Sequence, residues 1–404
     1  MKPDFLKDVR FADLTWAGAG PFSTKIFSDF GADIVKIESS VRLDSVRTGG
    51  PFKDRKFGVN RSGYFASRNT GKKSVVLDLK SETGRALVFD IIRTADVVSN
   101  NFGPGAMDRL GLGYEAVRAI KPDIIYLSMP MYGEDGPRAE MLGVGMTISA
   151  VTGLMWSTAY APGDPIGPGT HYPDHAANPY HAAFAVLAAL RRKRLTGEGM
   201  KIDLSQVEST INFIGTAFVA EAMTGAEPQA SNASDEMAPH GIYRCAGEDA
   251  WCAIAVDSDE AWRGMARLMG KPALAAEPRF ASAAARIENN AALDAIVTEW
   301  TSGQGADDVA RLLRQAGIPA AIVASSRHLV ETDAQLAARD YWQRVDHPEL
   351  GRSLYASPPY RVDGERVELS RPPLLGEHTR EVLGDLLGLD EAKLDALETA
   401  GVFK

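Results

Sequence analysis

Short apolar runs alternate with helical patterns through the first half of the 404-residue chain, and this order constrains the fold most. The runs are too short for buried helices and are rich in Val, Ile and Leu, which favours strands. Strands that alternate with helices predict a parallel sheet covered by helices on its faces. We expect strands at 9–14, 33–38, 74–79, 96–100 and 124–128. Because such sheets bind ligands beyond the carboxyl ends of their strands, we expect a site in loops 16–21, 100–105 and 129–137.

The segment 226–328 differs in character from the rest of the chain. It contains a predicted strand pair, at 241–245 and 250–256, and helices near 259–269 and 291–302. This pattern indicates a smaller α/β domain. We therefore predict a Rossmann-like large domain built from both chain ends, 1–225 and 329–404, with a small domain inserted at 226–328.

Charge and composition exclude several classes of partner. The chain has 44 basic and 53 acidic residues, a net charge of -9, which argues against nucleic acid. No run approaches the roughly 18 apolar residues of a membrane span, so we expect no membrane partner. Two cysteines, Cys245 and Cys252, cannot form a disulfide framework, and residues 1–5 lack a secretory pattern. We expect a cytoplasmic protein.

A glycine pair after the first strand has two competing interpretations. Gly18 and Gly20 precede a helix, and Glu38 ends the next strand, as in a dinucleotide fingerprint with a ribose-binding acid. Ser23 replaces the third glycine and Pro21 follows at once, which disfavours a nicotinamide dehydrogenase. The loop can still present backbone N–H groups to an anion.

Three histidines near one aspartate raise the question of a metal site. Pro173 separates His171 from His175, so the two do not share a helical face, and His181 lies inside a predicted helix. No cysteine joins them, and we expect no metal. The chain also lacks the G-x-S-x-G motif of serine hydrolases.

Asp174 is the carboxylate of interest. It precedes a helix for which Asn178 is a suitable N-cap and Pro179 a suitable first residue. A carboxylate near a helix N-terminus is stabilised as the anion and can face a substrate. Spacing alone favours the alternative, a loop aspartate that makes local turn hydrogen bonds.

Four segments carry a family pattern in the same order. Residues 19–38 resemble an opening of the form AGP…D.GA.VIKIE, and residues 69–80 resemble N.GK.S..LDLK. Residues 101–111 resemble NFGPGALDRLG, and residues 371–379 resemble RAPLLGEHT. Over nearly its whole length the chain thus resembles the class III CoA-transferases, of the formyl-CoA/carnitine-CoA transferase type.

This resemblance implies an activity and an assembly. Asp174 matches the family's nucleophile, which moves CoA from an acyl-CoA donor to a carboxylic acid through an aspartyl anhydride and an aspartyl-CoA thioester. CoA is then a substrate, and no tightly bound cofactor is expected. The family's interlocked dimers imply a homodimer or a heteromer with a related subunit.

The resemblance also implies contacts with CoA. We expect Leu77 and Phe102 to offer apolar surface to adenine, and Lys80 and Arg109 to offer charge to phosphates. Arg42, in the stretch 42–47, is a further phosphate candidate, with an ordinary surface arginine as the alternative. The remaining implied contacts are Gly18, Ala19, Asn101 and Gly103.

Departures from the family pattern bear on the acceptor. Formyl-CoA transferases carry Gln where Gly18 stands and a Tyr-Glu pair near Gly145 and Met146, and their glycine run is absent from 232–238. Formate and oxalate are therefore disfavoured. Segments 171–189 and 237–241 resemble the aryl-succinate CoA-transferase branch, so we predict a medium-sized or aryl-substituted (di)carboxylic acid. His175 and Tyr172 either shape the acid pocket or pack.

Two other functions remain as alternatives. A 2-methylacyl-CoA racemase of the same fold uses a histidine as acid and base, and here that stretch holds Val144 and Gly145, which exchange no protons. A non-catalytic subunit of a heteromeric transferase is the other, and the presence of Asp174 favours an active chain.

Overall fold

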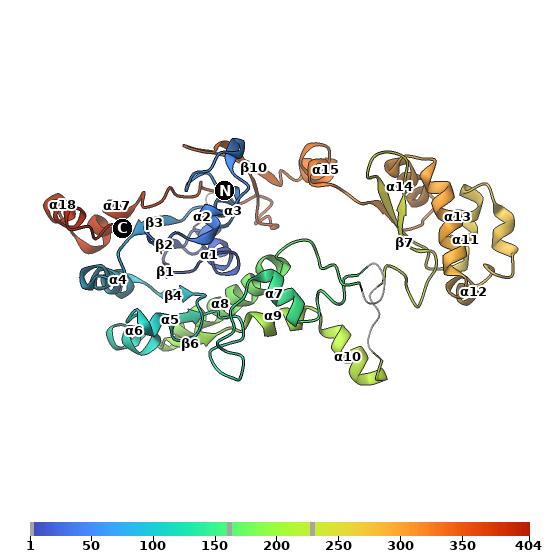
Figure 1. Ribbon diagram of the computed structural model, residues 1–404. Helices are drawn as coiled ribbons and strands as arrows, with labels where there is room; N and C mark the ends of the chain where they lie inside the picture. Colours follow the sequence, from blue (N-terminus) through green and yellow to red (C-terminus); the bar gives the residue numbers. More distant parts are fainter. Residues whose placement is uncertain (1–3, 160–163, 227–230) are drawn as a thin grey trace. The chain divides into compact units, whose positions relative to one another are not determined.

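The computed structural model describes residues 4–159, 164–226 and 231–404, which divide into two compact units (Figure 1). The large unit comprises Met1–Trp156, Gly167–Pro228 and Gln335–Lys404, and the small unit comprises Ser157–Ile166 and Gln229–Ala334. The expected cytoplasmic location rests partly on residues 1–5, and residues 1–3 lie outside the described residues. Residues 227–230, beside the predicted domain boundary at 226, also lie outside them.

A six-stranded parallel sheet forms the centre of the large unit, in the order β3-β2-β1-β4-β5-β6. The strands are β1 Arg10–Asp13, β2 Asp33–Glu38, β3 Lys73–Val76, β4 Val97–Asn100, β5 Ile125–Ser128 and β6 Met200–Asp203. This order is that of the Rossmann fold, and the predicted α/β class is confirmed. The sequence missed β6, because every second residue of this edge strand is exposed and no apolar run marks it.

Helices cover both faces of the sheet, and the C-terminal part of the large unit adds a β-hairpin. Around the first five strands the helices are α1 Ala19–Asp29, α2 Ser45–Thr48, α3 Gly63–Arg68, α4 Glu82–Thr94, α5 Ala106–Arg109 and α6 Tyr114–Ile120, with a short 3-10 turn, η1, at Lys53–Arg55. Further along are α7 Gly145–Val151, the turn η2 Pro173–Ala177, α8 Asn178–Thr196, α9 Gln206–Phe213 and α10 Gly215–Thr224. The C-terminal part adds α16 Ala334–Ala338, the antiparallel strands β10 Trp342–His347 and β11 Gly351–Ala356, and the helices α17 Thr379–Leu387 and α18 Glu391–Thr399.

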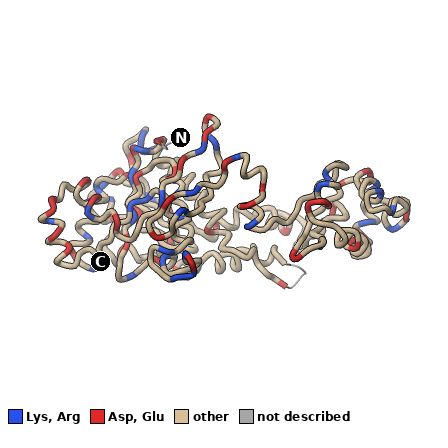
Figure 2. Tube along the Cα trace, turned by 90° about the horizontal axis from the view of Figure 1, so that it is seen from above, with Lys and Arg blue, Asp and Glu red and all other residues tan. Residues whose placement is uncertain are grey.

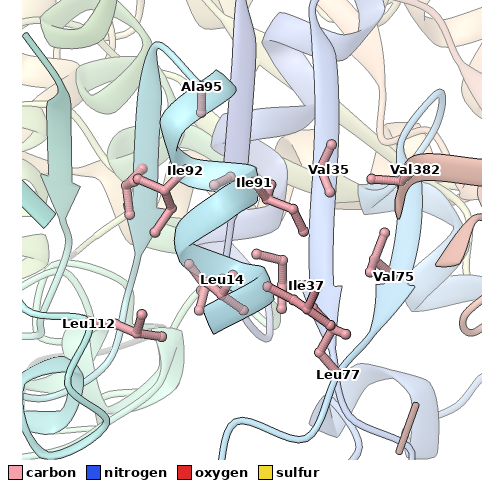
Figure 3. Close-up of a cluster of buried hydrophobic side chains, with 14 of the residues drawn as sticks. Leu14, Val35, Ile37, Val75, Leu77, Ile91, Ile92, Ala95, Leu112 and Val382 are labelled. Carbon is pink, nitrogen blue, oxygen red and sulfur yellow. The ribbon is translucent and has the colours of Figure 1, made fainter. Parts of the chain in front are cut away.

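Neighbouring residues of each central strand face opposite layers, because side chains alternate across a sheet. Ala12 belongs to the core beneath α4 and α17, whereas Phe11 belongs to the core beneath α1 and α8. Figure 3 shows the first core, where Val35 and Ile37 of β2 pack against Ile91 and Ile92 of α4. Burial on both faces explains why these strands are continuous apolar runs in the sequence.

The C-terminal segment joins the sheet of the large unit. The His378 N–H donates to the Ser74 carbonyl oxygen at 2.9 Å, and the Asp78 N–H donates to the Val402 carbonyl oxygen at 2.8 Å. The first 156 residues and the last 70 therefore share one hydrophobic core, as Val382 and Leu383 confirm by their burial in it.

The small unit has its own sheet and core. Strands β7 His240–Arg244, β8 Trp251–Ala255 and β9 Ala320–Ile322 form an antiparallel sheet in that order. The helical elements are α11 Asp259–Leu268, η3 Pro272–Ala276, α12 Ala283–Glu288, α13 Asn290–Ser302, α14 Ala306–Gln315 and α15 Ser326–Glu331. The predicted strand pair and both predicted helices are present, and the three-residue β9 was missed. Cys245 and Cys252 are free and buried here.

Charged residues of both signs are interspersed along the trace in each unit (Figure 2). Among the helices that the structure describes, none combines the length and the apolar composition that a bilayer span requires.

Candidate functional site

The strand order reverses between β1 and β4, so the loops that follow these two strands diverge and leave a crevice at the carboxyl edge of the sheet. Asn101, directly after β4, binds the loop that follows β1. Its Oδ1 accepts a hydrogen bond from the Trp16 N–H at 2.8 Å, and its Nδ2 donates to the Trp16 carbonyl oxygen at 2.8 Å. The two predicted loops 16–21 and 100–105 are therefore one structural unit.

Buried charges hold the same loop on its other side. Lys36 Nζ donates to the Thr15 carbonyl oxygen at 2.6 Å and lies 3.3 Å from Asp44 Oδ2. The Ala17 N–H donates to Asp44 Oδ1 at 2.9 Å. Ala17 has a φ of 62°, a left-handed conformation that costs an alanine about 1–2 kcal/mol. The surrounding hydrogen bonds hold this conformation and fix the direction in which the loop enters α1.

A cavity of about 750 Å³ opens at this crevice. Three exposed cations line it, and none of them makes an ion pair with a described residue: Arg42, Lys80 and Arg109. Arg42 stacks over the Trp16 ring at 5.5 Å. The apolar part of the wall is formed by Leu14, Ile37, Val41, Leu79, Phe102, Leu110 and Leu142. An apolar cavity of this size with unpaired cations suits a large ligand that carries phosphates.

The predicted CoA contacts fall into three groups. Arg42, Lys80, Phe102, Gly103 and Arg109 line the cavity. Asn101 positions the Trp16 backbone, and Ala19 is buried at the start of α1. Gly18 lies against Asp174.

The prediction that the Leu77 side chain contacts adenine is wrong, because this side chain is fully buried and offers no surface to a ligand. It continues the alternation of Val75 after β3 and packs in the core under α4. Leu79, two residues further along the same stripe, emerges into the cavity wall instead.

Glu38 has a structural partner. Its two carboxylate oxygens accept hydrogen bonds from Arg47 at 2.8 and 2.7 Å, and both side chains are buried. The Arg47 guanidinium also lies 3.5 Å from the centre of the Phe65 ring. This pair leaves Glu38 no free oxygen for a ribose, although Glu38 is part of the cavity wall. The dinucleotide interpretation therefore has no support in the structure.

Asp174 lies in η2, a π-helical turn that continues directly into α8. Such turns are frequent at functional sites. The expectation that Asn178 caps the helix is wrong, because helical backbone already begins upstream at Pro173. The Asn178 side chain is buried instead, with Nδ2 donating to Gln206 Oε1 at 3.0 Å and Oδ1 accepting from Ser209 Oγ at 2.5 Å. These bonds attach the start of α8 to α9.

Two glycines make room for the Asp174 carboxylate. A Cβ atom on Gly18 would lie 2.6 Å from Asp174 Oδ2, and one on Gly145 would lie 3.0 Å from the same oxygen. The Gly145 N–H donates a hydrogen bond to the carboxylate. The backbones of α1 and α7 thus enclose Asp174 from two sides. The spacing of the sequence could not reveal this, since residues 18, 145 and 174 come from three separate elements.

Burial makes this carboxylate unusual. Asp174 is 6% exposed, and burial raises its pKa to about 6, against the opposing effects of His171, the Gly145 N–H and Arg68. The neutral form is favoured because a charge in a poorly hydrated site loses solvation. Near pH 7 the group is therefore ionised but weakly solvated, a state that suits a nucleophile.

One residue beside Asp174 was not predicted from the sequence, Arg68 at the end of α3. Its Nη2 lies 2.9 Å from His175 Nδ1, and its guanidinium lies 4.5 Å from the centre of the Phe22 ring. Burial and the neighbouring Arg68 lower the pKa of His175 to about 4, so this imidazole is neutral at pH 7 and accepts the hydrogen bond. A single arginine next to the recognised segment 69–80 gave no signal of this role.

His171 lies near Asp174 and His175, but the other two histidines make separate contacts. His181 Nδ1 lies 3.0 Å from the Ala177 carbonyl oxygen of its own helix, and His175 contacts Arg68. Tyr172 stacks on Phe213 at 5.3 Å. In the part of the chain that the structure describes, no three His, Cys, Asp or Glu side chains are arranged to hold a metal ion.

Comparison with known proteins agrees with this geometry. A family model described as CoA-transferase family III matches residues 6–379. A formyl-CoA:oxalate CoA-transferase of Streptomyces avermitilis is 30% identical over 98% of this chain and 99% of its own length. A succinyl-CoA:glutarate CoA-transferase of Mus musculus is 30% identical over 100% of this chain and 91% of its own.

A solved structure shares the fold. The crystal structure of a CAIB/BAIF family protein from Brucella suis superposes with a TM-score of 0.87 at 30% identity, and covers 95% of this chain and 100% of its own. The chain therefore belongs to CoA-transferase family III and is an enzyme that moves CoA between acyl-CoA esters and carboxylic acids.

Proposed function

We propose that the enzyme transfers CoA through a covalent intermediate on Asp174. The observation that carries the proposal is the position of this carboxylate, buried between the backbones of Gly18 and Gly145 at the edge of the sheet where the crevice opens. Its raised pKa, about 6, leaves it ionised at neutral pH without a tight ion pair among the described residues. A poorly solvated anion is a stronger nucleophile than a hydrated one.

The proposed reaction has four balanced steps. An Asp174 oxygen attacks the donor thioester carbonyl, the C–S bond breaks, and a mixed anhydride and CoA thiolate form. The thiolate attacks the aspartyl carbonyl and releases the donor acid, which leaves an aspartyl-CoA thioester. The acceptor carboxylate attacks this thioester and expels the thiolate again. The thiolate then attacks the acceptor carbonyl, and Asp174 leaves as a carboxylate.

The CoA moiety belongs, on this proposal, in the cavity after β1 and β4. Arg42, Lys80 and Arg109 would bind phosphates, while Phe102 and Leu79 would contact adenine. The loop between Trp16 and Gly18 joins the two parts of the site, because Trp16 lines the cavity and Gly18 touches the nucleophile. A CoA ester that follows this loop would bring its thioester towards Asp174.

The acceptor is proposed to be a medium-sized or aryl-substituted (di)carboxylic acid. Gly18 and Gly145 have no side chains where formyl-CoA transferases carry polar ones, which supports an acceptor other than formate. The racemase alternative lacks a base at residue 145, because Gly145 contributes only its backbone N–H. The similarity to a succinyl-CoA:glutarate CoA-transferase supports an acid with two carboxylates.

Self-association into a cytoplasmic homodimer is the proposed assembly. Large apolar side chains are exposed on two helices of the large unit: Phe184 and Leu187 on α8, and Phe218, Val219 and Met223 on α10. Apolar groups that gather at a surface favour burial against a partner. Light scattering on the purified single chain tests this proposal, and a monomer with full activity would contradict it.

The test of the activity uses the single chain with succinyl-CoA or acetyl-CoA and a panel of acids, with both CoA esters followed by liquid chromatography and mass spectrometry. Wild-type enzyme should form a new CoA ester, and D174N should form none. The matched control is D90N, since Asp90 is an exposed carboxylate on α4 paired with Arg93. Full activity of D174N would refute the proposal, and an inactive wild-type chain would favour the non-catalytic subunit.

A further inference from the structure

Arg68 is a half-buried cation that forms no salt bridge with a described residue. Its Nε is fully buried and has no hydrogen-bond partner, and the residue makes no ion pair with any described side chain. Its contacts with the ring of the neutral His175, at 2.9 and 3.3 Å, involve Nη2, one of its three nitrogens. A half-buried guanidinium with unsatisfied donors is costly, and a planar carboxylate is the ligand that satisfies it with two parallel hydrogen bonds.

Arg68 also lines a second cavity, of about 360 Å³. The wall includes the aromatic rings of Phe22, Tyr180, Tyr341 and Tyr360. Lys25 lines it too, but this cation is already paired with Asp29. Arg68 is therefore the cation of this wall that remains available to an anion among the described residues.

Most of the remaining wall is apolar or aromatic. Tyr355 also lines the cavity, but its hydroxyl is buried away from solvent. The cavity thus combines aromatic surface with one unpaired cation, which fits a carboxylate attached to an apolar or aryl body.

The position of Arg68 connects this cavity with the chemistry. Its guanidinium touches His175, the residue directly after Asp174, and packs on Phe22 of α1, whose first residues adjoin Gly18. We propose that Arg68 binds the second, non-reacting carboxylate of a dicarboxylic acceptor whose apolar or aryl body occupies the cavity. The inference rests on the proposed function, because it assigns the specificity of that site.

The experiment compares dicarboxylic acids with matched acids that lack the second carboxylate: glutarate with butyrate, and phenylsuccinate with 3-phenylpropionate. The assays are made at about pH 8, where Asp174 is ionised, with wild type, R68Q, R68K and the control R118Q. Arg118 is an exposed arginine on α6, over Tyr114. In R68Q we expect KM for the dicarboxylic acids to rise about 10- to 100-fold, with kcat and KM for the monocarboxylic acids within about 3-fold of wild type.

R68K should recover part of the loss, since a lysine keeps the charge but not the two-pronged geometry. Preserved turnover of monocarboxylic acids shows that the variant is folded. An equal loss for both kinds of acid, no loss at all, or a wild-type preference for monocarboxylic acids would each overturn the inference.

Direct binding separates this inference from the proposed function. Calorimetry with phenylsuccinate and no CoA ester should show binding to wild type and a loss of about 10-fold or more in R68Q. If the wild type binds the acid in this way but transfers no CoA, the catalytic proposal fails and the Arg68 assignment stands. If transfer occurs and binding is independent of Arg68, the assignment fails and the catalytic proposal stands.

Discussion

The backbone of Gly18 touches the side chain of Asp174: a Cβ atom on residue 18 would lie 2.6 Å from Asp174 Oδ2 and 2.8 Å from the Tyr64 hydroxyl. Separations below 3.0 Å do not occur for real Cβ atoms, so any side chain here displaces the carboxylate. Glycine is needed at residue 18 only for this close contact with the carboxylate, because every residue type can adopt its φ of −96°.

G18A should therefore fold normally and lose activity. A displacement of about 1 Å at a reacting group lowers kcat about 100-fold, and we expect a loss of this order. G215A is the control, because no atom lies within 4 Å of the Cβ it would add on α10. Steady-state kinetics and a thermal melt measure both effects, and a fully active G18A would show that Asp174 has another position during catalysis.

Activity should depend on pH through Asp174. Its pKa is about 6, and the nucleophile must be the carboxylate, so kcat/KM should be flat above pH 7 and fall about tenfold per unit well below pH 6. The profile should be recorded with saturating and limiting acyl-CoA. A profile that stays flat down to about pH 4.5 would mean that the group in the folded enzyme has an ordinary carboxylate pKa.

The free energy of unfolding should also depend on the protonation of Asp174, in the opposite sense to the activity. The folded-state pKa of about 6 lies above the ordinary value of 3.8, so protonation stabilises the folded enzyme. This contribution is complete below about pH 4 and is lost as the pH rises through about 6. D174N cannot ionise, and at pH 8 it should be more stable than wild type by as much as about 3 kcal/mol.

Urea unfolding of both proteins between pH 4 and 8 measures this difference. The two curves should converge near the acid end and separate as the pH rises. A D174N protein that is less stable than wild type at pH 8 would show that the carboxylate is held by favourable contacts rather than opposed by burial.

The cations of the large cavity should bind the phosphates of CoA. K80Q and R109Q should each raise KM for the acyl-CoA donor about 3- to 30-fold, with less effect in high salt, because phosphate contacts at an exposed rim are screened. R93Q, at an exposed pair with Asp90, is the control. The variant whose KM differs little from that of wild type when the donor lacks the 3′-phosphate identifies the cation that binds this phosphate. An unchanged KM for the ordinary donor in both variants would show that CoA binds elsewhere.

The sequence predicted the sheet because its strands are buried on both faces. Val35, Ile37 and Val75 stand in continuous apolar runs for this reason. The edge strand β6 escaped prediction, since Lys201 and Asp203 face water. The site was predicted less completely. Leu77 was expected in the cavity, but it continues the buried stripe of Val75 in the core, and Leu79, two residues further along this stripe, is the one that reaches the cavity wall.

Contacts between distant elements could not be predicted from one sequence. Gly18, Gly145 and Asp174 meet only when α1, α7 and η2 pack together. Arg68 belongs to none of the recognised segments, and its role depends on the neighbours it acquires in the fold. Asn178 matched the residue preference of a cap, but the π-helical turn before it moved the start of the helix upstream.

The most direct test of the central claim uses an acceptor acid with both carboxylate oxygens as oxygen-18. In the proposed route the bridging oxygen of the acceptor anhydride stays on the enzyme when the thiolate attacks the acceptor carbonyl. One turnover should therefore add about 2 Da to the peptide that contains Asp174, and further turnovers about 4 Da. The control acceptor with ordinary oxygen should add nothing. Turnover without oxygen-18 in this peptide would show that CoA passes between the acids without a bond to Asp174.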